Sequence, residues 1–584
     1  MKEYTIAEKP SGERARELAE YSEIVQNLLF HRGIVTAPAA EAFISPDYDR
    51  DVHDPFLLHN MDKAIERILL AIERNEHIAL FSDFDADGIP SAVVMHDVLK
   101  KIGYENFSIT IPHRNIEGFG LNETAISNFI EKKVGLIITL DCGMGDVGHI
   151  ARATEAGIDV IITDHHMENQ EVPKAFAIVN PNQEGDTYPN KNLCGAGVAF
   201  KVAQAFLQKL EDKSKKKELT PAFMLHPSIA PGWEKWLLDM VGIATLSDMV
   251  SLTGENRVFV HYGLLVLRKS PRLGVRTLLS HLRIKQHTLT EDDVVFMITP
   301  RINAASRMDE PEAAFQLLST TDLTEAETLV RHLDTINNER KGAVAQMSKE
   351  IKQKFEETPN EFPVIVVGNT HWRPGLLGLA ATHAVEAYGK SAFVWGRGDA
   401  AVIKGSVRSD GRVGVMELMS EVRHLFIEFG GHKYSGGFSI TVENLMLLEG
   451  ALSEAHTKLA SKEVSEEKLT VDAVLSLDDV TQTTYSDITQ LAPFGAGNPK
   501  PVFAFEQIQI DRVEMFGKEK QHIKLLFKTS ANKMISAVKF FAKGNPTLEG
   551  LSAGQSITLL ASLEKETFGY TNGIRLRIVD VLTS

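Results

Sequence analysis

The chain alternates between short, uninterrupted apolar runs and longer stretches of helical periodicity. The apolar runs of strand length lie at residues 78–81, 134–140, 160–163 and 176–179. Strands that are apolar along their whole length are buried on both faces, which is typical of a parallel sheet covered by helices. The pattern therefore predicts an α/β domain in the first half of the chain.

The pattern changes in the second half of the chain. Apolar residues at helical spacing between Leu329 and Ile351, preceded by acidic residues, predict one long amphipathic helix that begins near Asp322. A second α/β segment begins at residues 363–367 and ends near residue 460. From about residue 465, short strands and turns alternate without long helical periods, as in an OB-like β-barrel.

These patterns define the predicted fold class. We expect an α/β protein with two domains built on parallel or mixed sheets, joined by a long helix and followed by an OB-like β-barrel. A chain of 584 residues is long enough for each domain to bury its own core. The predicted divisions are a helical N-terminal region (1–70), a first α/β domain with a helical extension (71–320), a linker helix (321–358), a second α/β domain (359–462) and the barrel (463–584).

Acidic residues and histidines follow three of the predicted strands. The first strand is followed by Asp83, Asp85 and Asp87, the second by Asp141, and the third by Asp164, His165 and His166. Because the carboxyl ends of parallel strands meet at one edge of the sheet, where ligands bind, we expect these side chains to converge. Neighbouring carboxylates repel one another unless a cation lies between them, and a mixed Asp and His set favours Mn or Mg, with Zn or Fe as alternatives.

The acidic run also fits two other interpretations. The spacing Asp-x-Asp-x-Asp-Gly opens an EF-hand calcium loop, but such a loop needs a Glu at its twelfth position, where this chain has Val94. A solvated acidic turn explains any one of the three clusters, but clusters at three strand ends favour a binding site. The sequence therefore predicts a metal centre, and several carboxylates are able to hold two ions for the displacement of a phosphoryl group.

Composition indicates where in the cell a protein with this metal centre would work. Cys142 and Cys194 are the only cysteines, so we expect neither a disulfide framework nor a thiolate metal site, and a reducing cytoplasm fits. The N-terminus lacks the apolar region of a signal peptide, and no apolar run has transmembrane length. We therefore expect a soluble, cytoplasmic protein that does not contact a membrane.

The net charge of −16 opposes a role in nucleic-acid binding, but the charge is unevenly distributed. Residues 500–543 contain nine Lys or Arg and four Asp or Glu, and they also contain several phenylalanines. Positive charge interleaved with aromatic rings is what single-strand binding requires, because phosphates are tracked while bases stack. The alternative is that the phenylalanines form the core of the barrel.

Motifs spread over residues 75–505 resemble, in order, those of the DHH phosphoesterase superfamily and, within it, of the RecJ family of single-strand-specific exonucleases. The first motifs are the strand-end clusters at 83–88, 140–143 and 164–166, and Asp248 stands where the fourth motif has its acid. The further motifs are residues 179–182, 195–201, 300–305, 404–409, 430–437 and 493–499. No single motif identifies the family, but their ordered set is strong support for it.

The resemblance implies roles for individual residues. The implied metal ligands are Asp83, Asp85, Asp87, Asp141, His165 and Asp248, with Asp83 as a ligand or a support of the same site. The implied catalytic residues are His166 at the reacting phosphate, Asp164 as the group that orients a histidine, and Asp141. The implied contacts to the phosphates of a strand are Arg114, Arg301, Asn303, Arg307, Ser406, Arg408 and His432. For each arginine the alternative is an ordinary ion pair, and for His432 it is an incidental position in a tight turn.

The resemblance also implies an activity. It implies a metal-dependent exonuclease that removes mononucleotides from the 5′ end of single-stranded DNA, in repair and recombination, with Mn or Mg as the cofactor. It further implies a monomer that works with a single-strand-binding protein and a repair helicase. Two alternatives stay open: a DHH phosphodiesterase for short oligonucleotides or cyclic dinucleotides, and a catalytically inactive scaffold that binds single strands.

The sequence departs from the family pattern at a few positions. Pro90 stands where a small polar residue is usual, Thr299 and Ser306 stand where glycine is expected, and Arg373 and Pro374 replace part of the stretch after Trp372. None of these residues is an implied metal ligand. The departures therefore concern the positioning of a strand and not the reaction.

Overall fold

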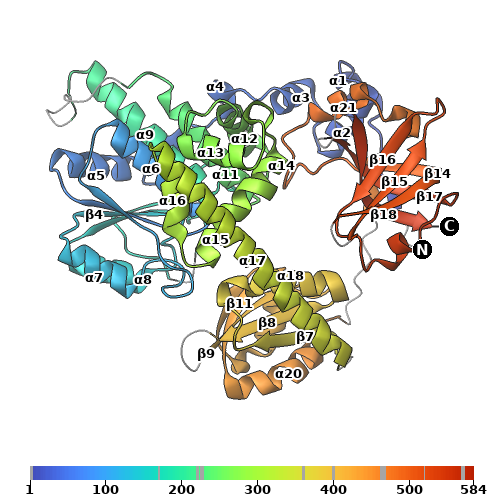
Figure 1. The fold of residues 1–584 in the computed structure, drawn as a ribbon. Coiled ribbons are helices and arrows are strands. Elements are labelled where there is room, and N and C mark those ends of the chain that lie inside the picture. The colour runs from blue at the N-terminus through green and yellow to red at the C-terminus, as the bar shows by residue number, and fades with distance from the viewer. Residues whose placement is uncertain are drawn as a thin grey trace. The chain divides into compact units, whose positions relative to one another are not determined.

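The computed structural model describes residues 4–168, 171–218, 223, 229–357, 362–397, 402–460, 469–517, 520–566 and 573–583. Contacts within the chain divide it into two units, whose elements are labelled in Figure 1. The larger unit comprises His53–Asp248 and Tyr262–Ser465, and the smaller comprises Met1–Val52, Met249–His261 and Glu466–Ser584. The N-terminal and C-terminal segments thus belong to one unit, an association that the predicted divisions do not include.

The first sheet of the larger unit is parallel throughout. Its strands are β2 (Ile78–Ser82), β3 (Phe107–Thr110), β4 (Leu136–Leu140), β5 (Asp159–Thr163) and β6 (Ala177–Val179), in the spatial order β3-β2-β4-β5-β6. Since β3 lies on one side of β2 and β4 on the other, the strand order reverses between β2 and β4. In sheets of this kind, the point of reversal opens a crevice at the carboxyl ends of the strands.

Helices cover both faces of this sheet, which explains why its strands are apolar along their length. One face packs against α7 (Glu123–Glu131) and α8 (Val147–Glu155), and their apolar residues share a core with β2 and β4. On the opposite side of the sheet in Figure 1 lie α5 (Met61–Glu73), α6 (Gly88–Lys101) and α9 (Gly195–Lys215). Pro90 lies in the first turn of α6, where a missing backbone N–H is tolerated.

A helical extension follows the first sheet. Its helices are α11 (Leu238–Ser247), α12 (Gly254–Leu267), α13 (Leu273–His281), α14 (Glu291–Asp293), α15 (Thr299–Arg307) and α16 (Pro311–Ser319). The part of α12 up to His261 is counted with the smaller unit. The long helix α17 (Leu323–Glu357) then leads into the second α/β domain, and its buried residues Val344, Met347 and Ile351 share that domain's core. This helix confirms the predicted long helix between the two α/β domains.

The second α/β domain has a mixed sheet. Its strands are β7 (Val364–Asn369), β8 (Ser391–Arg397), β9 (Val402–Arg408), β10 (Phe426–Gly431) and β11 (Ser435–Thr441), in the order β10-β11-β9-β8-β7. Only β7 and β8 pair in parallel among these described strands. Helix α18 (Leu377–Tyr388) packs with α17 in one core, and α19 (Val415–Glu421) and α20 (Val442–Ala460) pack in the other.

The smaller unit is a β-barrel with helices packed on it. The strands β14 (Phe503–Phe516), β15 (His522–Lys528), β16 (Met534–Lys539), β18 (Ile574–Thr583) and β17 (Ser556–Lys565) close into a ring because β14 pairs with both β15 and β17. The other elements are β1 (Tyr4–Ile6), α1 (Gly12–Glu17), α2 (Glu23–His31), α3 (Ala37–Ile44), α4 (Tyr48–Asp51), β12 (Leu469–Val471), β13 (Ala473–Val474), α21 (Gln482–Thr489) and α22 (Pro546–Glu549). Strand β1 pairs with β12, and Leu28 of α2 shares a core with Phe505 of the barrel.

The predicted fold class is confirmed: a parallel α/β domain, a mixed α/β domain, a long helix between them and a C-terminal barrel. The exact divisions of the chain at residues 70, 320, 358 and 462 stay predictions. Among the helices in the described part of the chain, none is long and apolar enough to span a membrane.

Candidate metal centre and phosphate pocket

The acidic clusters lie side by side at the carboxyl edge of the first sheet. The backbone N–H of Asp83 donates to the carbonyl of Leu140, and that of Asp141 donates to Thr163. Asp164 donates in the same way to Val179. Each acidic residue therefore extends the ladder of its own strand by one bond, and the parallel register brings the clusters to one edge, at the point where the strand order reverses.

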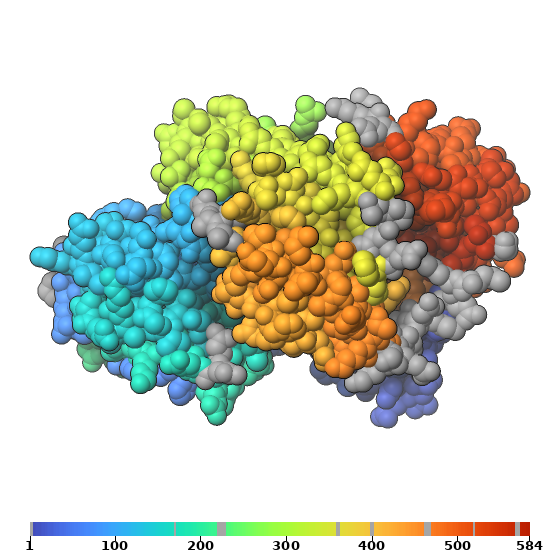
Figure 2. Space-filling model, turned by 90° about the horizontal axis from the view of Figure 1, so that it is seen from below, coloured from blue at the N-terminus to red at the C-terminus, as the bar shows by residue number. Residues whose placement is uncertain are grey.

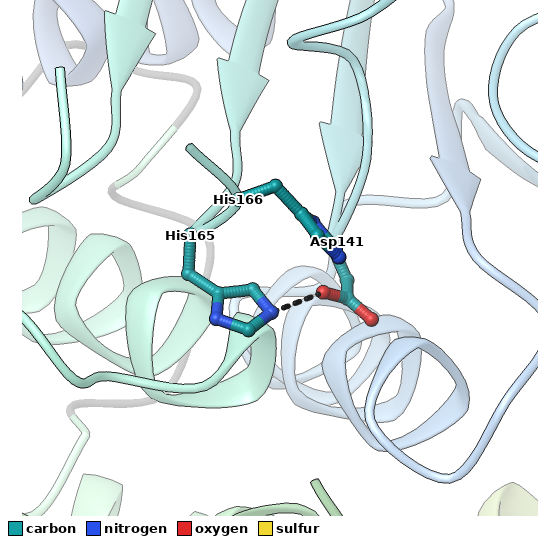
Figure 3. A group of neighbouring side chains, drawn as sticks. All are labelled: Asp141, His165 and His166. Carbon is teal, nitrogen blue, oxygen red and sulfur yellow. Dashed lines mark ion pairs between the residues drawn. The ribbon is translucent and has the colours of Figure 1, made fainter. Parts of the chain in front are cut away.

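The structure forms overlapping groups of side chains whose oxygen or nitrogen atoms lie within 4.8 Å of one another. These groups are Asp83 with Asp85 and Asp141, Asp87 with His165 and Asp248, and Asp141 with His165 and His166. His165 Nε2 lies 3.2 Å from Asp141 Oδ1 and 3.7 Å from Asp87 Oδ2, and a dashed line marks the first of these ion pairs in Figure 3. All six residues implied as metal ligands are thus brought together.

Burial and mutual repulsion raise the free energy of these carboxylates in their charged form when no cation is present. Burial and the charge of Asp85 raise the pKa of Asp83 well above its usual range, and burial with the charges of Asp87 and Asp85 does the same for Asp141. Burial and the same two neighbours raise the pKa of Asp248 to about 8. A cation between these groups removes the cost, because it pairs with each carboxylate.

Two buried oxygens point to the same conclusion. Asp83 Oδ1 and Asp141 Oδ1 are buried and accept no hydrogen bond in the described part of the chain, although His165 Nε2 lies 3.2 Å from Asp141 Oδ1. An unpaired buried carboxylate oxygen is expensive, and oxygen ligands with an imidazole are what Mn and Mg take from proteins. The donor set therefore fits a divalent metal of this kind.

Asp87 is held by the start of a helix. Its two carboxylate oxygens accept hydrogen bonds from the backbone N–H groups of Gly195 (2.6 Å) and Ala196 (2.7 Å), at the N-terminus of α9. The partial positive charge of that helix end stabilises the carboxylate. Asp85 is held within its own loop, where Oδ1 accepts from the N–H groups of Asp87 (2.8 Å) and Gly88 (3.2 Å).

Asp141 has an unusual backbone conformation. Its φ of 61° lies in the left-handed region, which costs free energy for a residue with a side chain. A Cβ atom at Gly195 would lie only 2.4 Å from Asp141 Oδ1. The absence of a side chain at residue 195 therefore gives Asp141 the space it occupies, and sequence reasoning named Gly195 only as part of a motif.

The two histidines differ in their surroundings. Burial lowers the pKa of His165, which keeps the ring neutral and its nitrogens available as ligands. His166 Nδ1 lies 2.7 Å from Asp164 Oδ1, and although burial opposes the charged ring, this bond and the nearby carboxylates raise the pKa of His166 to about 9. Asp164 also accepts the backbone N–H groups of both histidines, so it organises the whole turn.

An exposed aromatic ring lies beside His166. Phe119 is 53% exposed, and its ring centroid lies 5.6 Å from that of His166 in an edge-on arrangement. Phe119 belongs to the loop between β3 and α7 that also carries Arg114. Sequence reasoning did not single out this residue, because one aromatic in a loop gives no periodic signal.

Guanidinium groups gather next to the acidic edge. Burial and the charges of Arg114 and Arg340 lower the pKa of Arg307 to about 9, and burial and the charge of Arg114 lower that of Arg408. Arg307 donates to the carbonyl of Gly375 (2.8 Å), and Arg408 donates to Ser406 Oγ (3.3 Å). Cations that disfavour one another's charge form a cluster suited to an anion with several oxygens, such as a phosphate, and we call this cluster the phosphate pocket.

Arg340 is a member of this group that sequence reasoning missed. Its Nε is buried without a hydrogen-bond partner in the described residues, and it lies on the long helix α17. Nothing in the helical period distinguishes it from the other charged residues of that helix. Only the packing of α17 brings it to the pocket.

Two of the three remaining implied phosphate contacts, Arg301 and Asn303, have other partners in the structure. Arg301 pairs with Asp334 at 2.6 Å and donates to the carbonyl of Met297, which is the geometry of the ion-pair alternative. Asn303 Oδ1 accepts the backbone N–H of Ala86 (3.0 Å), so it supports the acidic loop. His432 is exposed in the turn between β10 and β11. The predicted contacts of these three residues with a strand stay predictions.

The departures from the family pattern are accommodated without disturbing the acidic edge. Thr299 Oγ1 lies 2.7 Å from Ser247 Oγ, a residue that directly precedes Asp248. Ser306 Oγ is buried and has no partner among the described residues. Both positions lie on α15, which also carries Arg307.

The barrel surface combines rings and positive charge. Phe503, Phe505 and Phe527 are buried in the core, as the alternative interpretation expects. A second set of rings instead forms a cluster that reaches the surface, which we call the aromatic cluster: Phe516, His522, Phe540 and Phe541. The guanidinium of Arg577 lies 4.3 Å from the centroid of the Phe540 ring.

The fold and the acidic edge together define a metal-dependent phosphoesterase of the DHH class. The N-terminal domain model of the DHH family matches residues 77–225, the DHHA1 domain matches residues 361–458, and the RecJ OB domain matches residues 471–580. The single-stranded-DNA-specific exonuclease RecJ of Bacillus subtilis (strain 168) is 33% identical over 581 residues, which are 99% of this chain and 70% of that protein. The chain belongs to the RecJ family of single-stranded-DNA-specific exonucleases.

Solved structures agree with this membership. The crystal structure of RecJ in complex with Mn²⁺ from Thermus thermophilus shares the fold, with a TM-score of 0.80 at 23% identity over 99% of this chain and 79% of that chain. A crystal structure of exonuclease RecJ bound to manganese is 28% identical, with a TM-score of 0.58, over 70% of this chain and 97% of that chain.

Proposed function

We propose that this protein is a metal-dependent exonuclease that hydrolyses single-stranded DNA from its 5′ end to mononucleotides. The observation that carries the proposal is the position of a buried set of carboxylates and histidines next to a group of guanidinium groups. The acidic set suits metal ions, and the cationic group suits a phosphate. The names of the relatives, single-stranded-DNA-specific exonucleases, support the same substrate.

We propose that the metal is Mn or Mg and that two ions bind. Six residues would hold them: Asp83, Asp85, Asp87, Asp141, His165 and Asp248. When bound, the metal supplies a hydroxide at neutral pH and offsets charge on the reacting phosphate. The manganese bound in the crystal structure of a related exonuclease RecJ supports this choice.

His166 would act on the reacting phosphate itself. Its Nδ1 is engaged by Asp164, which leaves Nε2 to donate a proton to the departing oxygen. Although burial opposes the charged ring, the bond to Asp164 raises the pKa of His166 and so favours the protonated form that a proton donor requires. Arg114, Arg307, Ser406 and Arg408 would hold the phosphate at or near the 5′ end.

Phe541, the exposed member of the aromatic cluster on the barrel, would stack on a base of the strand, since base stacking on aromatic rings tolerates any sequence. A monomer that cooperates with a single-strand-binding protein and a repair helicase is proposed from the family resemblance. The proposed setting is the cytoplasm.

The test compares Mn²⁺-dependent release of mononucleotides from 5′-labelled single-stranded DNA, duplex DNA and a dinucleotide. We expect rapid release from the single strand and little from the duplex. Release from the dinucleotide alone would favour a phosphodiesterase for short substrates, and binding without hydrolysis would favour an inactive scaffold.

The variant that tests the metal site is Asp141→Ala. We expect it to lower hydrolysis by at least about 100-fold while strand binding is mostly preserved, because Asp141 lies among the metal groups and not among the guanidinium groups. Asp141→Asn keeps the left-handed backbone, which Asn tolerates, and separates the loss of charge from a change of fold. Full activity in a pure preparation of Asp141→Ala contradicts the site.

A further inference from the structure

A close contact joins the two α/β domains of the larger unit. Figure 2 shows these domains adjoining on one face, the first in cyan to teal and the second in yellow to orange. The contact links the loop at residues 113–121 with the turn at Pro374–Leu376. The loop carries Arg114, and the turn directly precedes α18, which lies against Arg408.

The side chain of Asn115 connects three segments at this contact. Its amide nitrogen donates to both carboxylate oxygens of Asp309, at 2.9 and 2.8 Å. Its amide oxygen accepts the backbone N–H of Gly375 at 2.9 Å. A side-chain amide donates from one atom and accepts at another without carrying a charge, so Asn115 matches an acidic residue on one side and a backbone N–H on the other.

Gly375 is held from two directions. Its N–H donates to Asn115, and its carbonyl accepts from the guanidinium of Arg307 at 2.8 Å. A Cβ atom at this buried position would lie 2.9 Å from the carbonyl oxygen of Arg307 and 3.1 Å from Asn115 Oδ1. The turn of the second domain is therefore closely fitted against the first.

The contact is also fixed within the first domain. Asp309 accepts the backbone N–H of Asn115 (3.1 Å), and its carbonyl bonds the ring of His113 (2.9 Å). Arg114 and Arg307 thus lie within two residues of members of the contact, while Ser406 and Arg408 lie on β9 of the second domain. The phosphate pocket has one half on each domain, and the Asn115 contact spans the two.

We infer that Asn115 is a positioning residue which, through Asp309 and Gly375, sets the spacing between the guanidinium groups that the two domains bring to a 5′-terminal phosphate. The inference rests on the proposed function, because it concerns the substrate pocket of the same enzyme. Asn115 does not touch the phosphate. It acts by keeping the halves of the pocket at the spacing that one phosphate can bridge.

The experiment exchanges donor and acceptor between residues 115 and 309. In Asn115→Asp, two carboxylates face each other and the contact is lost. In the double variant Asn115→Asp with Asp309→Asn, residue 115 still accepts from Gly375, the amide of residue 309 donates to it, and the charge of the pair is unchanged. Asn also tolerates the left-handed backbone of residue 309, whose φ is 66°.

The readout is KM and kcat on matched single strands that carry a 5′-phosphate or a 5′-hydroxyl. We expect Asn115→Asp to raise KM for the phosphorylated strand roughly tenfold with kcat nearly unchanged, because the loss of a hydrogen bond to a charged group weakens binding by about that factor. KM for the strand with a 5′-hydroxyl should change much less. The double variant should restore KM for the phosphorylated strand to within about twofold of the value of the unmodified protein. The control is Asn106→Asp, which changes an exposed side-chain amide that donates to the carbonyl of Asn75.

Two results would overturn the inference. One is an equal loss on both strands, which indicates a purely structural role, and the other is failure of the double variant to recover the phosphate preference. If the unmodified protein does not hydrolyse single strands at all, the proposed function fails, and this outcome is separate because it needs no variant.

Discussion

Burial raises the pKa of several acidic residues of the first domain, and one of them, Asp146, lies outside the metal groups. Asp146 follows β4 and directly precedes α8 without a side-chain capping bond to that helix, and its Oδ2 instead accepts the backbone N–H of Leu121 at 2.8 Å. Burial raises its pKa from 3.8 to about 6. It therefore holds the end of the loop that carries Arg114 while being most stable as the neutral acid.

This shift predicts a pH dependence of stability. The folded state binds the proton of Asp146 more tightly than the unfolded state does, so the stabilisation is present below pH 3.8 and is lost as the pH rises through about 6. Relative to Asp146→Asn, the free energy of unfolding should fall by roughly 2 kcal/mol between pH 4 and pH 7. Urea denaturation of both proteins at a series of pH values measures it, and a pH-independent difference contradicts the assignment.

Helix α9 is the element on which the acidic edge depends most. Its first two N–H groups hold Asp87, and its first residue leaves room for Asp141. The helix thus positions acids that follow two different strands. Its own stability comes from its buried apolar residues, so a change at its first residue alters the site more than the fold.

Two glycines of this helix make a matched pair for a test. A Cβ atom at Gly195 would overlap Asp141, whereas at Gly197 the nearest atom is 3.5 Å away. Gly195→Ala should lower hydrolysis about 100-fold or more, since small displacements of reacting groups cost that much, and it should weaken Mn²⁺ binding. Gly197→Ala should leave activity within about twofold, because the contact is ordinary and Ala favours helix. Steady-state kinetics and calorimetric Mn²⁺ titration measure both, and equal effects of the two changes would exclude the steric explanation.

At the scale of the whole molecule, binding surfaces are divided between units. The metal groups and guanidinium groups belong to the larger unit, and the aromatic cluster belongs to the smaller one. Phe541 is 81% exposed, and its backbone has a φ of 54°, which is strained for a bulky residue. An exposed ring held in a strained conformation is expected at a binding surface.

The division predicts an effect that depends on substrate length. Phe541→Ala should raise KM for a long single strand about fivefold or more, the usual contribution of one stacked base, and should leave dinucleotide hydrolysis unchanged. Met534→Ala is the control, because Met534 is an exposed apolar residue of the same barrel outside the cluster. Fluorescence anisotropy and kinetics on strands of graded length measure the effect. An equal loss on the dinucleotide would place the defect in catalysis.

The sequence by itself determined the parts of the protein that depend on local pattern. Continuous apolar runs identified the buried strands, and the polar residues that follow them identified the acidic edge. Parallel strands necessarily align their carboxyl ends, so local patterns were enough to predict that Asp85, Asp141 and His165 would converge.

Only the tertiary structure decided the rest. The association of residues 4–52 with the barrel, the ion pair of Arg301, the space that Gly195 gives Asp141 and the membership of Arg340 in the pocket all depend on contacts between residues far apart in the chain. Periodicity reports which face of an element is buried, but not which distant element covers it. The Asn115 contact has the same origin, because its donor and acceptors become neighbours only when the two α/β domains meet.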